Sequence, residues 1–403
     1  MQIRSTTEAD LDTFLSTLCD AFGSVWQSPG ESPWWAAYEM DRHLLAEDAA
    51  GRPIGTAGAY SFELTLPGGA TAPAAGITGV GVLPSHRRQG VLSALMRHQL
   101  EQLRGAGEFL AVLLATEAVI YRRFGYGPAS YRQRVAVDLG RGAFAVPVEA
   151  GGSIELRHRA DCEEELAEVY DRVRLVQPGA LSRPAHWWAK GAGRPPVSRA
   201  PRHIAFHRDA AGRLQGYACY TIAVTDQQRS LRTLTVEELV AATDEAQAAL
   251  ARYCLDHDLV STVVFADLPP RSPLRWRLAD YRAARTEAEQ DYLWVRLLDV
   301  PRALAARGYP ADGRLVVEVD DPFLGERGRY LLVVADGVGV CEPTGEPTEL
   351  ALDVADLGSL YLGGTRASDL VRAGRIRELV PGAALRADAL LGAEREPHCV
   401  HFF

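Results

Sequence analysis

The stretch of residues 80–92 constrains the fold and the chemistry of this chain more than any other part of it. It reads Val-Gly-Val-Leu-Pro-Ser-His-Arg-Arg-Gln-Gly-Val-Leu. The apolar run of residues 77–83 is typical of a buried strand, and Pro84 ends it. Over residues 91–103 apolar side chains recur at spacings of one, three and four, which predicts an amphipathic helix that ends near Gly105. We therefore expect a strand, a short loop and a helix N-terminus in direct succession.

A loop that leads from a strand into a helix N-terminus is suited to bind an anion. The first N–H groups of the helix have no partner within it, and the positive end of the helix dipole points the same way. Gly90 lets the backbone approach a bulky phosphate closely, and Arg87 and Arg88 add positive charge. No G-x-x-x-x-G-K-[ST] is present, and no G-x-G-x-x-G joins a strand to a helix, which argues against P-loop and dinucleotide sites. The pattern predicts a site for a pyrophosphate.

The composition is typical of a soluble globular protein with several domains. The length of 403 residues suggests two or three domains, and the hydrophobic and charged fractions are 47% and 24%. No apolar run approaches the roughly 20 residues that span a bilayer, and the N-terminus lacks the apolar core of a signal peptide. These features predict a cytoplasmic protein with no membrane partner. The net charge of −9 argues against nucleic acid as a partner and favours small cationic substrates.

The cysteines and histidines give no indication of a metal. The six cysteines lie far apart without a C-x-x-C, so neither a zinc site nor a disulfide framework is expected. His398 and His401 are spaced like ligands on a helix, but no third ligand accompanies them. We therefore expect no metal.

The chain divides into three parts of mixed α/β (α+β) character, residues 1–140, 150–295 and 300–403. The second part repeats the rhythm of the first but has no Pro-x-x-Arg-x-x-Gly after a strand. The expected helices cover residues 6–22, 117–124, 162–173, 235–256, 302–307, 353–360 and 367–373. The expected strands cover residues 43–47, 54–64, 109–115, 204–207, 215–224, 260–266, 314–319 and 330–334. Trp187 and Trp188 are expected in a core or an interface rather than in a ligand platform.

The pyrophosphate loop resembles the acetyl-CoA loop of the GNAT acetyltransferases, V-x-P-x-x-[RQ]-x-x-G-x-[GA]. Val82, Pro84, Arg87 and Gly90 match this pattern, whereas Leu92 stands where the general family has Gly or Ala. An Arg-Arg-x-Gly-aliphatic-aliphatic loop is expected of one branch, the Eis-type acetyltransferases. This resemblance implies an N-terminal GNAT domain, a second, degenerate GNAT-like domain without a CoA site, and a C-terminal sterol-carrier-protein-like domain. It also implies acetyl-CoA as co-substrate and a homohexamer.

The resemblance places acetyl-CoA against the strand end, the loop, the helix start and the segment after the next strand. The expected contact residues are Val80, Gly81, Val82, Arg87, Arg88, Gln89, Gly90, Val91, Leu92, Ser93, Thr116 and Glu117. The backbone N–H of Val82 or Leu83 is the natural donor to the thioester carbonyl.

A second motif points to the general acid. The segment Ile-Tyr-Arg-Arg-Phe-Gly-Tyr at residues 120–126 resembles the GNAT segment [FY]-Y-x-x-x-G-[FY], whose first tyrosine lies beside the CoA sulfur. Tyr121 falls at that position, so its phenol is expected to protonate the departing thiolate. Arg122 and Arg123 would favour the ionised form of the phenol if they lie close to it. Tyr126 matches the trailing aromatic, which is a packing position in the family.

No histidine or glutamate has the local context of a general base, and the resemblance implies that the base lies at the end of the chain. In Eis-type enzymes the C-terminal α-carboxylate reaches back into the catalytic domain and takes this part. This chain ends on His-Cys-Val-His-Phe-Phe. Its last two residues are apolar, whereas chain ends are usually polar. Burial of Phe402 and Phe403 would deliver the carboxylate of Phe403 to the site and raise its pKa.

Aromatic and acidic residues after the first helix are candidates for the acceptor pocket, because aromatic walls with carboxylates suit a polyamine or an amino sugar. The expected substrate-binding residues are Trp26, Glu31, Trp34, Trp35, Glu39 and Phe402. The resemblance implies an acetyl-CoA-dependent N-acetyltransferase that acts on a multi-amine compound of aminoglycoside type. Two alternatives remain open, namely a lysine N-acetyltransferase for peptides or proteins, and an acyl-CoA- or lipid-binding module without turnover. Release of free CoA on addition of amines separates the enzymes from the module.

Overall fold

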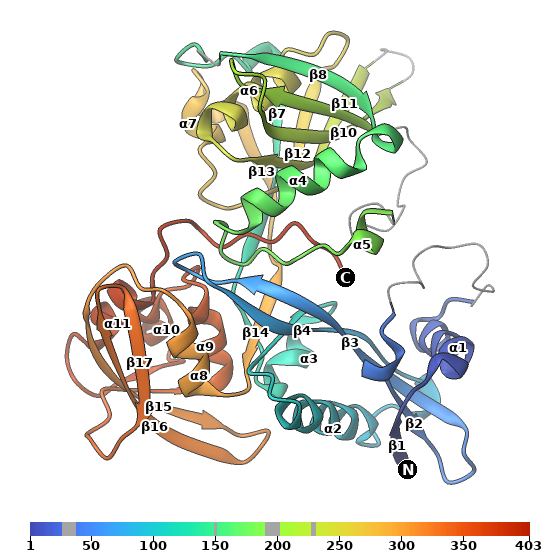
Figure 1. The fold of residues 1–403 in the computed structure, drawn as a ribbon, viewed down its shortest axis with the longest axis vertical. Helices are drawn as coiled ribbons and strands as arrows, with labels where there is room; N and C mark the ends of the chain where they lie inside the picture. Colours follow the sequence, from blue (N-terminus) through green and yellow to red (C-terminus); the bar gives the residue numbers. More distant parts are fainter. Residues whose placement is uncertain (26–37, 149–150, 190–201, 227–230) are drawn as a thin grey trace.

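The computed structural model describes residues 1–403 apart from 26–37, 149–150, 190–201 and 227–230. The described residues form two seven-stranded sheets and one five-stranded sheet, each in a lobe of its own (Figure 1). In that part of the chain, no helix combines the length and the apolarity needed to cross a bilayer.

The first sheet, in the order β1-β2-β3-β4-β5-β14-β6, carries the predicted loop. Its strands are β1 (Gln2–Ser5), β2 (Leu44–Glu47), β3 (Pro53–Thr65), β4 (Thr71–Val82), β5 (Leu110–Leu114), β14 (Leu293–Leu297) and β6 (Gly127–Pro128). Its helices are α1 (Leu11–Phe22), α2 (Val91–Gly105) and α3 (Ala118–Tyr121). Leu100 of α2 packs on Ile77 and Leu113, on one face of β4 and β5. The other face of β3 and β4, with Phe62 and Ala74, joins a core that extends into the third lobe.

The second sheet, in the order β13-β7-β12-β11-β10-β9-β8, is covered by a helix on each face. Its strands are β7 (Tyr131–Asp138), β8 (Ser153–His158), β9 (His203–Arg208), β10 (Leu214–Asp226), β11 (Leu231–Ala241), β12 (Thr262–Leu268) and β13 (Ala284–Asp291). Its helices are α4 (Glu163–Arg174), α5 (Ala185–Ala189), α6 (Asp244–Leu255) and α7 (Leu274–Arg277). Trp187 and Trp188 are buried, as the sequence predicts.

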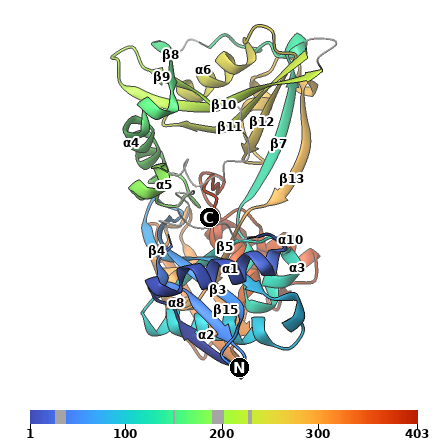
Figure 2. The same ribbon diagram turned by 90° about the vertical axis from the view of Figure 1, so that its right-hand side faces the viewer.

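Two strands are exchanged between these lobes. β7 follows the first lobe in sequence but pairs with β12 and β13, whereas β14 follows the second lobe and pairs with β5 and β6. Figure 2 shows β7 and β13 side by side, running from one lobe to the other. The expected boundary at residue 295 falls within β14, and the one at 140 leaves β7 with the first part of the chain although β7 pairs in the second sheet.

The long helix expected over residues 235–256 is wrong in its first half. Residues up to Ala241 belong to β11, where buried and half-buried side chains alternate as they do in a strand. α6 begins only at Asp244, and the side chain of Thr243 caps it by accepting the N–H of Ala246 at 3.1 Å. The apolar residues in this stretch fit both the period of a helix and that of a strand, so the packing of the folded chain decides which of the two forms.

The third lobe packs on the free edge of the first sheet. Its strands are β15 (Gly313–Asp321), β16 (Glu326–Ala335), β17 (Val338–Pro343), β18 (Leu350–Asp353) and β19 (Arg377–Glu378), and its helices are α8 (Val300–Ala306), α9 (Val354–Tyr361), α10 (Ala367–Arg372) and α11 (Ala383–Leu391). A methyl group at Gly127 of β6 would lie 1.8 Å from the carbonyl oxygen of Ala355 in α9. Gly127 therefore permits this backbone contact.

The last residues of the chain leave the third lobe and run between the other two (Figure 1). The N–H of His398 donates to the carbonyl of Pro178 at 2.9 Å, and its Nε2 lies 3.0 Å from Oδ1 of Asp267 in β12. The tail is thereby bound to the second lobe before it reaches the first.

Candidate active site

The centre of the site is the point where β4 and β5 stop pairing. These strands run in parallel, and in the described ladder their last pair is Ile77 and Leu113. Beyond it, Gly79 and Val80 of β4 oppose one residue of β3, which is a β-bulge, and Gly79 adopts a φ of +58°. The hydroxyl of Thr56 donates to the carbonyl of Gly79 at 2.7 Å and holds this bend. The strands thus leave an opening in the sheet, because β4 continues to Val82 without a neighbour from β5.

The predicted anion loop lies directly after this opening. Arg88 and Gly90 have φ values of +62° and +84°, and Gly90 is the N-cap of α2. The first intrahelical N–H is that of Ala94, which donates to the carbonyl of Gly90 at 3.0 Å, so the N–H groups of residues 91–93 point out of the helix end. A Cβ atom built on Gly90 meets no protein atom within 4 Å, and the first turn of α2 holds no acidic side chain. The loop therefore offers N–H groups and open space for a pyrophosphate.

The two loop arginines differ in their contacts. Nη2 of Arg87 donates to the carbonyl of Ala21 at 2.8 Å, so this side chain also fastens the loop to the end of α1. Arg88 is exposed at the left-handed turn. Gln89 donates from Nε2 to the carbonyl of Ser85 at 3.1 Å, which stabilises the loop internally.

The corresponding helix of the second lobe lacks these properties. Only Ala242 and Thr243 connect β11 to α6, and the Thr243 cap already satisfies one helix N–H. Asp244 and Glu245 occupy the first turn of α6. Their carboxylates would repel a pyrophosphate at this helix end, so the physical features of a CoA site occur in the first lobe.

Of the two backbone N–H groups expected to donate to a thioester carbonyl, that of Leu83 already has a hydrogen-bond partner. Its N–H donates to the carbonyl of Ile54 at 3.0 Å. Because N–H groups alternate in direction along an antiparallel strand, that of Val82 points away from β3, toward the opening. Val82 is therefore the remaining candidate.

Tyr121 lies on the α2 face of the sheet, in one apolar cluster with Val80 and Leu92. Its side chain is buried, and burial raises the pKa of the phenol, although a hydrogen bond with Thr116 opposes this effect. The phenol is therefore protonated at neutral pH. Tyr126 is fully buried against it, with ring centroids 6.3 Å apart, which suits a packing role.

The expected effect of the neighbouring arginines on Tyr121 is wrong. Arg122 turns to the third lobe, where Nη2 lies 2.7 Å from Asp353 and 3.0 Å from Asp356. Arg123 lies over the ring of Phe124 at 4.8 Å. Both side chains have other partners, and neither contributes to the pKa shift of Tyr121.

The last residue of the chain lies on the opposite face of the sheet. The ring of Phe403 packs edge-on against Phe62 at 5.0 Å, and its Cε2 would be 3.2 Å from a Cβ built on Gly76. Gly76 and Ile77 are consecutive in β4, so their side-chain positions face opposite ways. The opening between β4 and β5 therefore lies between Tyr121 on one face and Phe403 on the other. The expected burial of Phe402 is wrong, since its side chain is 40% exposed.

The expected acceptor residues Trp26, Glu31, Trp34 and Trp35 lie outside the described residues. Glu39 is described, and both of its carboxylate oxygens accept hydrogen bonds from Ser61 of β3, one from the N–H at 2.8 Å and one from the hydroxyl at 2.5 Å. Glu39 also forms an ion pair with Arg42, whose Nε lies 3.9 Å from Oε2.

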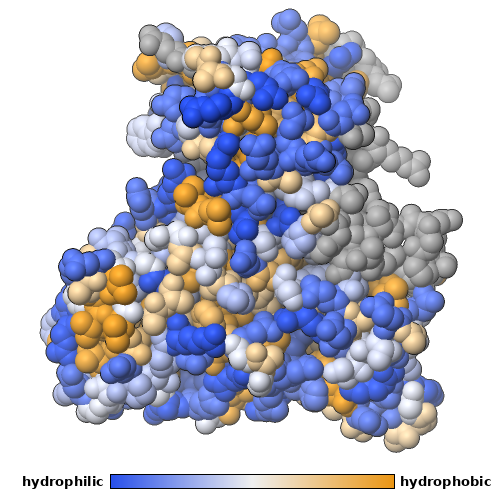
Figure 3. Space-filling view, in the orientation of Figure 1, coloured by the Kyte–Doolittle hydropathy of each residue, from blue (hydrophilic) through white to orange (hydrophobic). Residues whose placement is uncertain are grey.

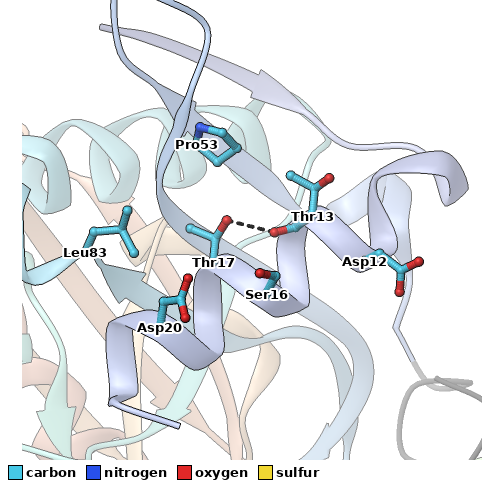
Figure 4. Close-up of a pocket in the computed structure, with 7 residues that line it drawn as sticks. All are labelled: Asp12, Thr13, Ser16, Thr17, Asp20, Pro53 and Leu83. Carbon is cyan, nitrogen blue, oxygen red and sulfur yellow. Dashed lines mark hydrogen bonds between the residues drawn. The ribbon is translucent and has the colours of Figure 1, made fainter. Parts of the chain in front are cut away.

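A hollow of about 600 Å³ on the outer face of α1 lies beside the start of the loop at Leu83 (Figure 4). Asp12 and Asp20 stand at its two ends, and the hydroxyl of Thr17 donates to the carbonyl of Thr13 at 2.7 Å. Two carboxylates disfavour a phosphate in this hollow. Within the described ranges, no three His, Cys, Asp or Glu side chains are grouped as they would be around a metal ion.

Comparison with known proteins agrees with this geometry. The family model of an acetyltransferase (GNAT) domain matches residues 2–129, another GNAT model matches 179–297, and a sterol carrier protein domain matches 300–400. The N-acetyltransferase Eis of Mycobacterium tuberculosis is 33% identical over 97% of this chain and 96% of its own. This chain belongs to the Eis family of GNAT N-acetyltransferases.

Further relatives are consistent with an Eis-type enzyme. An uncharacterized N-acetyltransferase of Streptomyces avermitilis is 36% identical over 91% of this chain and 90% of its own. The crystal structure of Eis1 from Mycobacterium abscessus superposes with a TM-score of 0.88 at 34% identity over the full length of both chains. A GCN5-related N-acetyltransferase from Anabaena variabilis, 22% identical with a TM-score of 0.83 over both full chains, shares the fold.

GNAT acetyltransferases use acetyl-CoA, and the residues of this Eis-type chain fit it. The opening between β4 and β5, the outward N–H groups at the start of α2 and the space in front of Gly90 are what a thioester with a pyrophosphate requires.

Proposed function

We propose that this Eis-type enzyme acetylates amines of a small multi-amine compound of aminoglycoside type, by direct attack of the amine on the thioester. The net charge of −9 supports a cationic acceptor, and Glu39 is the described acidic residue that we expect to contact it. Acetyl-CoA supplies the acetyl group, whose C–S bond breaks as the C–N bond forms. The pyrophosphate is held by the N–H groups that start α2, with charge from Arg87 and Arg88.

Three groups of the chain divide the chemistry. The terminal carboxylate of Phe403 accepts a proton from the amine, which is nucleophilic only when neutral. The N–H of Val82 donates to the carbonyl oxygen as negative charge develops there. Tyr121 gives its phenolic proton to the thiolate that leaves. The placement of Phe403 and Tyr121 on opposite faces of one opening carries this proposal, because the amine that attacks the planar thioester and the sulfur that leaves it are different atoms of the tetrahedral intermediate and need separate proton acceptor and donor groups.

Three variants of the chain end test the base. Deletion of Phe403 moves the carboxylate back by roughly 3.5 Å of chain and removes a ring. A short Gly-Ser tail converts the carboxylate into an amide and keeps both rings. Phe403→Leu keeps a carboxylate at the same place on another apolar side chain. We expect the first two to lose most of the turnover, measured as free CoA released, and the third to keep a good part of it. Full activity of a tailed, correctly assembled protein would exclude the terminal base.

A panel of aminoglycosides, polyamines and lysyl peptides tests the acceptor class in the same assay. Aminoglycosides should give the highest kcat/KM, and a clear preference for lysyl peptides would overturn the proposed class. Turnover with any of these amines would also separate the enzyme from an acyl-CoA- or lipid-binding module.

We further propose that the enzyme assembles as a homohexamer. Apolar side chains gather on the surface of the third lobe (Figure 3), where Val333 of β16 and Val340 of β17 are direct cross-strand partners and both are exposed. Val338 extends this patch, which supports burial of the surface between subunits. Light scattering after size-exclusion chromatography tests the subunit number, and a stable monomer would contradict it.

A further inference from the structure

A buried arginine of the second lobe contacts the end of the chain, and none of the motifs described above includes it. Arg183 lies between α4 and α5, and its side chain is inaccessible to solvent. Its Nη1 and Nη2 donate to the two carboxylate oxygens of Glu238 in β11, at 3.0 and 2.9 Å. Its Nε donates to Nδ1 of His401 at 3.0 Å, and Nη2 also donates to the carbonyl of Val400 at 3.3 Å. These bonds use four of the five guanidinium N–H donors.

The second lobe holds this guanidinium in one orientation. It lies over the ring of Tyr170 at 4.0 Å and over Trp188 at 5.2 Å. Glu238 also accepts the hydroxyl proton of Tyr217. A planar fork that is paired at both ends and covered by aromatic rings has little freedom to turn. Arg183 therefore offers the tail hydrogen-bond donors in fixed positions.

The two residues that Arg183 contacts on the tail are consecutive, which sets the direction of the chain that follows. The His401 ring packs between Trp187 at 4.8 Å and Phe62 at 5.2 Å, and the Phe403 ring lies parallel to it at 6.1 Å. The carbonyl of His401 accepts the hydroxyl proton of Tyr292 at 3.2 Å. The tail is thereby fixed two residues before its carboxylate.

We propose that Arg183, oriented by Glu238, is the positioning residue for the C-terminal carboxylate. The second GNAT domain, which lacks the features of a CoA site, thus takes part in the reaction of the first by setting where the terminal base stands. This inference rests on the proposed role of Phe403 as the general base. Arg183 itself touches no reacting atom and acts through the tail.

Arg183→Lys is the first test, because lysine keeps the charge beside Glu238 but lacks the Nε–H that reaches His401. Arg174→Lys is the matched control. Arg174 also joins the second lobe to the first, with Nη2 3.1 Å from Glu63 and Nε 2.7 Å from Asp171, but makes neither of these tail contacts. We expect Arg183→Lys to lower kcat roughly 10- to 100-fold, with the KM for acetyl-CoA unchanged, and Arg174→Lys to leave both unchanged. Equal kcat values for the two variants would overturn the proposal.

Two variants on the tail keep the test independent of the folding of Arg183→Lys. His401→Gln retains a side-chain acceptor for Nε, whereas His401→Leu removes it. We expect the glutamine variant to keep more of kcat than the leucine variant. The reverse order would contradict alignment by this bond.

A double-variant experiment separates positioning from general stabilisation. In the protein with the Gly-Ser tail the carboxylate is gone, so Arg183→Lys should cause little further loss of kcat. A further loss of the same size as in the untailed protein would overturn positioning. Full activity of the tailed protein would overturn the terminal base and its positioning together. Loss of activity on tailing with normal kcat for Arg183→Lys would overturn positioning alone.

A readout without turnover completes the test. A carboxypeptidase that prefers aromatic ends should release Phe403 faster from Arg183→Lys than from Arg174→Lys, because the tail is held less firmly. Equal release rates would contradict the role of Arg183 in fixing the tail.

Discussion

Replacement of Gly90 by valine tests the site on which the acetyl-CoA assignment depends, and the chain contains a matched control. Gly90 caps α2 with φ +84° and ψ −1°, and Gly382 caps α11 with the same two angles. A β-branched residue in this region of backbone space costs about 1–3 kcal/mol at either place. Both variants should therefore lose a similar amount of stability in denaturant unfolding.

The two variants should differ in ligand binding. A Cβ built on Gly90 enters space that contains no protein atom within 4 Å, in front of the loop where we place the pyrophosphate. Loss of one charge-assisted hydrogen bond costs about 1.5–3 kcal/mol, which corresponds to a Kd for acetyl-CoA raised roughly 10- to 150-fold. Gly382→Val should leave this Kd unchanged.

Isothermal titration calorimetry of both folded variants at one salt concentration measures the difference. An unchanged Kd for Gly90→Val would refute the pyrophosphate site. An equal rise in Kd for Gly382→Val would show that backbone strain, rather than contact with the ligand, weakens binding.

Two further predictions concern Tyr121 and His43. Tyr121→Phe should keep acetyl-CoA affinity and lower kcat about 10²–10⁴-fold. Because burial raises the pKa of the phenol, any alkaline decline of wild-type kcat that depends on Tyr121 should lie above pH 10 and be absent from the variant. A variant with full kcat would show that the thiolate leaves without this proton. Burial lowers the pKa of His43 to about 4, so the folded state resists protonation and the stability present above pH 6.5 is lost as the pH falls, by about 2 kcal/mol at pH 5. His43→Asn, which can still donate to the carbonyl of Glu39, should remove this pH dependence of urea unfolding, and an equal slope in both proteins would contradict it.

Much of the candidate site follows from neighbouring residues in the sequence. The loop that ends at Gly90 and the first turn of α2 are contiguous, so spacing and residue type suffice to predict an anion site there. Tyr121 likewise lies in a short local motif. In contrast, the local pattern assigns residues 235–241 to a helix, and only pairing with β10 and β12 makes them a strand. An apolar stretch that satisfies two periods is settled by its neighbours in space.

The sequence by itself therefore determined the anion loop, the acid candidate and the apolar chain end, because each depends on residues within a few positions of one another. Only the tertiary structure decided how they are used. Arg122 follows Tyr121 directly in sequence, yet it forms an ion pair with Asp353 of the third lobe. Arg183 binds His401, which lies 218 residues further along the chain. β7 pairs in the sheet of the second lobe and β14 in that of the first, each away from the strands that precede it in sequence. Such contacts join groups that are far apart along the chain. They form because a buried charge and a buried backbone group each need a partner, and the spacing of neighbouring residues does not predict which partner that is.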